Sequence, residues 1–391
     1  MKSFGRINND EQNGLDMEEE LDAESEKINI PFDPTSVDIA DKKISINALL
    51  ERLEHFELNL SPDFQRRANL WDDVRKSRLV ESMLLRIPLP SFYFSEDANG
   101  NFEVVDGLQR LCAIFHFVDH VALNKATKAK LNPLRLTGMQ YLVENNGSSF
   151  GDLNRPFQRR IKELEIHVNV IRATTPKEVM FNVFARLNQG GLPLTAQEIR
   201  NAIYPGEWRT HIRNIAEGNA FISATKGKVP IDRQQDMEMI LRFVSLWSLG
   251  APFLRPTNQV LDKFLNDSVE FRLASMKKIE WENVHLAFIK GIQASMEIFG
   301  VHVFRKSFGN RFKSPMNKGL FESQLITLAE LEEGEIHTLI KNKQKVSDEF
   351  GKLITGDNKF NSSLRSGTGH AESSNARILG LRNIFNKVLN A

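Results

Sequence analysis

The chain has little of several things that would place it in a class at once. It contains a single cysteine, Cys112, in 391 residues, which excludes an internal disulfide framework and favours a reducing compartment. Its formal net charge is +1, so the chain as a whole does not attract nucleic acid, although a local basic face stays compatible with that charge. No apolar run reaches the length of a membrane span and no apolar core follows a basic start, so we expect a cytoplasmic protein without membrane contact.

The sequence also lacks the signatures of several common chemistries. No stretch reads GxxxxGK followed by Ser or Thr, and no cysteines and histidines stand at zinc-binding spacing. His370 is the only histidine after His337, so we do not predict an HNH nuclease module near the end of the chain. Cys112 falls in the apolar helical pattern LCAIF, which favours a buried structural thiol over a nucleophile.

What is present divides into three parts. Residues 1–27 are acidic and poor in large apolar groups, which predicts a disordered tail. Residues 28–204 mix aromatic-rich strands with helices, and residues 205–391 read as successive amphipathic helices, including one over residues 319–342. We therefore predict an α+β chain, with a small mixed sheet in the N-terminal domain and an all-helical C-terminal domain.

Local signals within the N-terminal domain are specific. Apolar residues at helical spacing from Ile44 to Phe56 predict a helix, with Ser45 as its N-cap. Two apolar segments flank Asn99-Gly100, which predicts a β-hairpin. Alternating Ile166, Val168 and Val170 predict a further strand.

The stretch VVDGLQR, residues 104–110, places polar residues at a junction between a strand and a helix. Gly107 lets the backbone turn tightly and lets a ligand approach, and the amides at a helix N-terminus attract anions. Arg110 can chelate a phosphate, while Asp106 can hold Arg110, a ribose hydroxyl or a metal ion. A structural Asp–Arg pair at the end of a strand explains the same residues equally well.

Four ordered segments carry a resemblance to a known family. They read DFQRRANLW, RLVESMLLRIPLPSFYF, VVDGLQRLCAI and FARLNQGGLPLTAQEIRNAIY, and span about residues 64–204. In this order they resemble the N-terminal domain of GmrSD-type restriction endonucleases, within the ParB/sulfiredoxin-like superfamily. RQQDMEMILRF, residues 233–243, resembles the helical region that follows in that family.

The resemblance implies a nucleotide site. Family members usually read Asp-Gly-Gln-Gln-Arg where this chain has Asp106, Gly107, Leu108, Gln109 and Arg110, so Leu108 replaces the first glutamine. In related defence proteins this motif is linked to nucleotide binding and hydrolysis, which implies a nucleoside triphosphate. Phosphoryl transfer needs its charge neutralised, and Asp106 is the first candidate for an acid that binds Mg²⁺. By the same resemblance Gln65 and Arg66 lie near this pocket. In a functional interpretation of the segment RLNQGGLPLT, Arg186 and Asn188 also point into it.

Several of these residues have a structural alternative. In the segment RLNQGGLPLT, Thr195 caps the next helix whether or not Arg186 and Asn188 reach a nucleotide. Glu81 is a second candidate acid, but pairing with Arg78 or Arg86 on a helix face explains it better.

Three functions follow as hypotheses. The first is a nucleotide-binding, NTP-hydrolysing protein of bacterial restriction or anti-phage type, with DNA, a partner protein or a second copy of the chain as partner. The second is a non-catalytic DNA-binding or scaffold protein. The third, a nuclease built on the ParB-like domain, has little support because the sequence shows no multi-carboxylate metal centre. The basic cluster at residues 155–160 can touch nucleic acid phosphates, but a solvated helix face explains it more simply.

Overall fold

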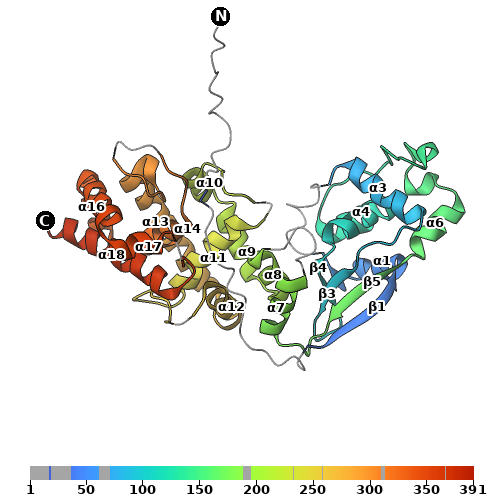
Figure 1. Ribbon diagram of the computed structural model, residues 1–391, viewed down its shortest axis with the longest axis horizontal. Helices are drawn as coiled ribbons and strands as arrows, with labels where there is room; N and C mark the ends of the chain where they lie inside the picture. The colour runs from blue at the N-terminus through green and yellow to red at the C-terminus, as the bar shows by residue number, and fades with distance from the viewer. Residues whose placement is uncertain are drawn as a thin grey trace, which may run out of the picture. The chain divides into compact units, whose positions relative to one another are not determined.

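The structure, a computed structural model, describes residues 17–18, 37–60, 71–187, 195–231, 233–257, 259–309, 313–365 and 367–391. The chain forms two compact units (Figure 1). The sheet unit is residues 30–205, and the helical unit is residues 206–391 together with residues 1–29. The α+β prediction is confirmed, because a small mixed sheet lies in the first unit and helices make up the second.

The sheet has five strands in the order β1-β5-β3-β4-β2. In that order they are β1 (Ile39–Ser45), β5 (Glu165–Ile171), β3 (Phe92–Glu96), β4 (Phe102–Asp106) and β2 (Leu58–Asn59). The β1–β5 and β3–β4 pairs are antiparallel, whereas β5–β3 and β4–β2 are parallel. This register sets the end of β4 beside the start of β3, because Asp106 pairs with Tyr93.

Seven helices accompany the sheet in this unit, and the first five of them contribute to one apolar core. They are α1 (Ile46–Glu54), α3 (Asp73–Leu84), α4 (Leu108–Val118), α5 (His120–Thr127), α6 (Arg155–Lys162), α7 (Lys177–Leu187) and α8 (Ala196–Ile203). The core joins α1, α3, α4 and α6 to alternate residues of β3 and β5, among them Phe92, Phe94 and Val168. It fixes the start of α4 against the sheet.

Local sequence signals explain most of these boundaries. The Ser45 hydroxyl accepts a hydrogen bond from the Ala48 N–H at 3.2 Å, which confirms it as the N-cap of α1. The predicted hairpin also forms, with Gly100 at a φ of +81° in the turn. The helix expected from Ile44 begins two residues later, because residues 39–45 pair with β5 instead. Strand β1 was missed because its partner lies over a hundred residues away.

The helical unit contains ten α-helices within its described residues. They are α9 (Trp208–Ala216), α10 (Asn219–Thr225), α11 (Gln235–Trp247), α12 (Leu261–Phe271), α13 (Lys278–Phe299), α14 (Lys318–Ala329), α15 (Glu333–Lys341), α16 (Lys343–Gly356), α17 (Asn358–Ser363) and α18 (Ala371–Leu389). Helix α14 packs against α11, α13 and α18. No helix in the described part of the chain is long and apolar enough to cross a membrane.

The prediction of one amphipathic helix over residues 319–342 was wrong. The segment forms α14 and α15, and every residue from Gly319 to Ala329 is buried. Its polar side chains are satisfied inside the unit: Glu322 pairs with buried Arg377 at 2.7 Å, and Thr327 donates to the Ser323 carbonyl at 2.7 Å. A helix with polar residues all round can therefore lie at the centre when neighbouring helices bring the partners.

Two residues of the acidic N-terminal segment are described, and both contact the helical unit. Met17 is buried and forms a parallel bridge with Met316. Glu18 accepts hydrogen bonds from Lys306 Nζ at 2.5 Å and from Asn317 Nδ2 at 2.9 Å. The rest of the predicted tail, residues 1–16 and 19–27, lies outside the described residues.

Candidate functional site

The junction between β4 and α4 requires glycine at one position. Gly107 has a φ of +94°, in the left-handed region that other residues rarely adopt. A Cβ atom added there would lie 2.3 Å from Cδ1 of Phe92, a ring buried in the core. The backbone can therefore enter α4 at this angle only because no side chain is present.

The Arg110 guanidinium forms hydrogen bonds with neighbouring groups of the protein. Its Nη1 donates to the Pro90 carbonyl at 2.5 Å, and its Nη2 donates to the Ser91 carbonyl at 3.1 Å and to Asp106 Oδ2 at 3.0 Å. The guanidinium lies over the Phe92 ring, 4.3 Å from its centroid, and the side chain is 14% exposed. Burial lowers the pKa of Arg110, and the Asp106 carboxylate opposes that effect. Arg110 therefore ties the entry of β3 to the first turn of α4.

The Asp106 carboxylate can still bind a ligand. Its side chain is 36% exposed, and Oδ2 takes the hydrogen bond from Arg110. Within the described residues no donor is bonded to Oδ1 and no side chain caps the N-terminus of α4. The first-turn amides thus face the region beside this carboxylate, and Gln109 stands half-buried in the same turn.

These groups suit a magnesium ion only if a phosphate shares it. The described residues hold no cluster of three acidic, histidine or cysteine side chains that would bind a metal alone. Mg²⁺ is commonly held by one or two carboxylates together with substrate phosphates, and the partly exposed Asp106 carboxylate fits that pattern.

The structure brings four of the predicted site residues together: Asp106, Gly107, Gln109 and Arg110. Gln65, Arg66 and Asn188 lie outside the described residues, and for Arg186 only the backbone, near the end of α7, is described. Thr195 forms the predicted capping box with Glu198 at the start of α8.

Glu81 has a different role from either one considered for it. The carboxylate is 4% exposed and accepts backbone hydrogen bonds from Gln140, Tyr141 and Leu142, the shortest at 2.7 Å. Burial raises the pKa of Glu81, but these N–H donors outweigh it and the pKa is lowered. The expected pairing with Arg78 or Arg86 is therefore not its main contact, although the Arg78 charge also favours ionisation. Glu81 anchors the segment after α5.

A cleft of about 550 Å³ lies in the sheet unit between residues 86–89, α6 and the start of β5. Three arginines line it: Arg86, Arg159 and Arg160. The sequence indicated the basic character of α6 but did not indicate that Arg86 faces it. The cleft wall runs directly into Pro90 and Ser91, whose carbonyls bind Arg110.

Comparison with known families agrees with this domain. Residues 46–205 match the family described as GmrSD restriction endonuclease, N-terminal domain. These residues form a GmrSD N-terminal domain. No curated protein and no solved structure matches the chain. The match covers most of the sheet unit, so the predicted resemblance is confirmed there.

Leu108, which stands where the family motif usually has glutamine, lies at the start of α4. Leu108 is half-buried and packs against the apolar core at the first position of α4. The replacement therefore removes a polar side chain beside Asp106 and Gln109 while leaving the helix start in place.

Proposed function

We propose that the sheet unit is the nucleotide-binding module of a restriction-type, anti-phage protein, and that it hydrolyses a nucleoside triphosphate. The match to the N-terminal domain of GmrSD restriction endonucleases supports the restriction type. In this proposal the phosphates bind at the N-terminus of α4. We expect Gln65, Arg66, Arg186 and Asn188 to complete the pocket.

The observation that carries this proposal is the junction of β4 with α4. Gly107 opens an uncapped helix start, and the half-exposed Asp106 carboxylate lies beside it. A positive helix end next to one carboxylate is a suitable place for the phosphates of a magnesium–nucleotide complex. Bound there, Mg²⁺ would neutralise charge on the phosphate oxygens.

The residues of the junction take distinct roles. Asp106 Oδ1 would hold the metal, while the Gln109 amide, which can both donate and accept hydrogen bonds, would orient the attacking water. Arg110 is a positioning residue, because its donors already bind Pro90, Ser91 and Asp106. It holds the Asp106 carboxylate in place beside the start of α4.

The test is binding and turnover of ATP, GTP, CTP and UTP with Mg²⁺ by the full chain and by Asp106→Asn. Asparagine still offers Arg110 an acceptor but removes the charge, so we expect affinity for the magnesium complex to fall at least about tenfold, or ~1.4 kcal/mol, with the fold retained. Asp41→Asn, an exposed carboxylate on β1, is the matched control. Equal nucleotide affinity in all three proteins would contradict the proposal.

A second function is favoured by a specific observation. The Asp106–Arg110 ion pair and the two carbonyl bonds of Arg110 are complete without a ligand, as a structural junction in a scaffold protein would be. That protein would bind DNA or a partner and would bind no nucleotide. Absence of nucleotide binding by the wild-type chain, together with salt-dependent binding of DNA, would select this alternative.

A further inference from the structure

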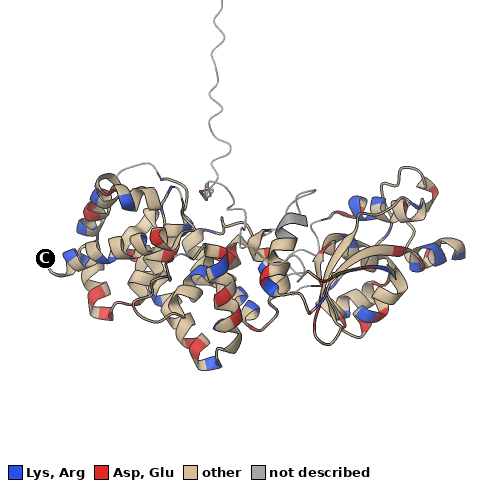
Figure 2. Cartoon of the chain, turned by 60° about the horizontal axis from the view of Figure 1, so that its bottom comes forward, with Lys and Arg blue, Asp and Glu red and all other residues tan. Residues whose placement is uncertain are grey.

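The cleft between residues 86–89 and α6 is lined by three arginines and two glutamates, Glu163 and Glu165, so acidic side chains balance its positive charge only in part. Helix α6 carries Arg155, Arg159, Arg160 and Lys162 and no acidic residue. In Figure 2 this helix, at the right-hand end, is largely blue. The Arg159 side chain is 69% exposed and has only a 3.9 Å contact with Glu163. Arg160 is held in place by a 2.6 Å hydrogen bond from its Nη1 to the Leu84 carbonyl.

Arg86 occupies a position whose backbone favours glycine. Helix α3 ends in a Schellman motif: the Arg86 N–H binds the Met83 carbonyl at 3.1 Å, and the Ile87 N–H binds the Ser82 carbonyl at 2.9 Å. Arg86 is the left-handed residue of this motif, with a φ of +60°. A residue other than glycine costs about 1 kcal/mol there. The side chain is exposed, and no described residue forms an ion pair with it.

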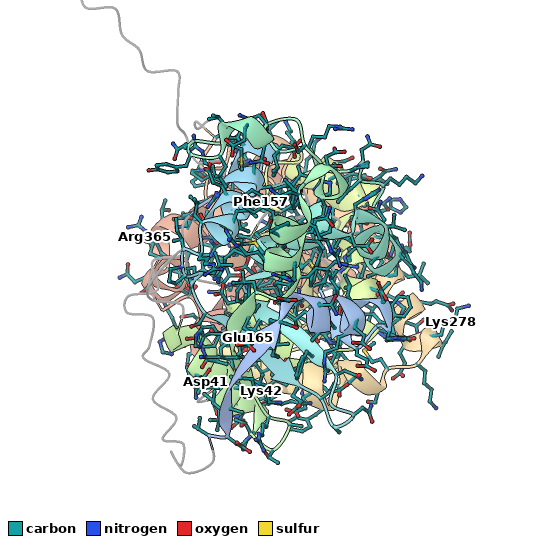
Figure 3. The ribbon with its side chains drawn as sticks, turned by 90° about the vertical axis from the view of Figure 1, so that its right-hand side faces the viewer. Asp41, Lys42, Phe157, Glu165, Lys278 and Arg365 are labelled. Atoms are coloured by element: carbon teal, nitrogen blue, oxygen red, sulfur yellow. The ribbon has the colours of Figure 1, made fainter. Side chains whose placement is uncertain are left out.

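The shape and chemistry of the cleft suit an extended polyanion. Its arginines come from two walls, Arg86 from the loop after α3 and Arg159 with Arg160 from α6. Glu165 and His167, by contrast, come from the third wall, β5. Figure 3 looks onto this end of the unit and labels Phe157 of α6 and Glu165. Because Arg86 and Arg159 are exposed on the loop and helix walls and Arg160 is half-buried between them, a phosphate chain can follow them without entering an enclosed pocket.

We propose that this cleft binds the phosphate backbone of DNA, with Arg86, Arg159 and Arg160 as the phosphate contacts. The choice of DNA as the polyanion rests on the restriction-type function proposed above. The strained backbone at Arg86 and the charge of α6 are independent of that function. Since Arg110 binds the carbonyls of Pro90 and Ser91, the same short segment leads from the DNA cleft to the nucleotide junction.

The first experiment measures binding of a fluorescein-labelled 20-base-pair duplex by the full chain, using anisotropy between 50 and 200 mM NaCl. Each phosphate contact contributes a slope of about −0.9 to log K against log salt, so Arg86→Gly/Arg159→Gln should reduce the slope by about 1.8. If affinities converge at 1 M salt, binding at 0.1 M falls by about 60-fold. The control Lys128→Gln/Lys130→Gln removes the same charge from exposed lysines after α5 and should bind as wild type.

The variant Arg86→Gly separates binding from folding. Glycine relieves the left-handed strain, so labelling of the buried Cys112 thiol should become about fivefold slower while DNA affinity falls. A protein that is more stable and binds DNA less tightly has lost a ligand contact and not its fold.

Three results would overturn the proposal. They are absence of DNA binding by the wild-type chain at 50 mM NaCl, an equal loss in the lysine control, and an unchanged salt slope in Arg86→Gly/Arg159→Gln. Nucleotide binding is measured on the same proteins, and we expect it to survive in the arginine variant. Loss of nucleotide affinity there with DNA binding intact would make the cleft a nucleotide site. Failure of Asp106→Asn to affect nucleotides would instead count against the nucleotide proposal alone.

Discussion

Replacing Arg110 by alanine tests whether this residue supports the junction. Two of its hydrogen bonds end on the carbonyls of Pro90 and Ser91, and hydrogen bonds from a charged donor contribute about 1.5–3 kcal/mol each. The ion pair with Asp106 adds little, because that carboxylate is 36% exposed. From the lower value for each carbonyl bond, we expect Arg110→Ala to lower the free energy of unfolding of the sheet unit by about 3 kcal/mol.

The single cysteine provides the assay. Cys112 lies two residues further along α4 and is 4% exposed. Burial raises the pKa of its thiol well above the ordinary value, so a thiol reagent reacts when the unit opens. A loss of 3 kcal/mol makes opening, and therefore labelling, on the order of 100-fold more frequent. Tryptophan fluorescence serves poorly here, since Trp71 is the only tryptophan among residues 30–205.

Arg155→Ala is the matched control, because this α6 arginine makes only an exposed 3.5 Å contact with Gln158. Its labelling rate should equal that of the wild type. An Arg110→Ala protein that labels at the wild-type rate would refute the supporting role. In that case the guanidinium would be available to a phosphate, as the sequence motif alone suggested.

Three further outcomes are expected. Gly107→Ala should lower the free energy of unfolding by at least about 2 kcal/mol, because its φ is +94° and an added Cβ would lie 2.3 Å from an aromatic carbon. Gly100→Ala, with a φ of +81° and open space around it, should lower it by about 1 kcal/mol. The rates of Cys112 labelling compare the two variants. The lowered pKa of Glu81 means that its carboxylate stabilises the fold above its ordinary pKa of 4.5 and that this stability is lost as pH falls through the folded pKa. The difference in melting temperature between wild type and Glu81→Gln should therefore shrink from about pH 7 to about pH 3, and a constant difference would contradict it. Arg377→Ala should lower the free energy of unfolding of the helical unit by about 3–5 kcal/mol, because it leaves the buried Glu322 carboxylate without its partner. Urea unfolding followed by tryptophan fluorescence measures this loss, and a loss under about 1 kcal/mol would refute the prediction.

The sequence alone determined the features that depend on neighbouring residues. The Asn99-Gly100 turn, the Ser45 cap and the strand-to-helix junction at Gly107 form as predicted, because each is a matter of backbone angles or of a hydrogen bond within a few residues. The order of four short motifs was likewise enough to indicate the GmrSD N-terminal domain.

Only the tertiary structure decided which groups these local elements meet. The sequence shows Arg110 beside Asp106, but its carbonyl partners in the loop before β3 are twenty residues away and become visible only when β3 pairs with β4. The sequence suggests that Glu81 is a surface carboxylate, but in the structure residues 140–142 cover it and donate hydrogen bonds to it. Arg86 and Arg159 line the same cleft because α3 and α6 pack together. Contacts between distant segments depend on how whole elements pack, and the residues within one segment do not encode that packing by themselves.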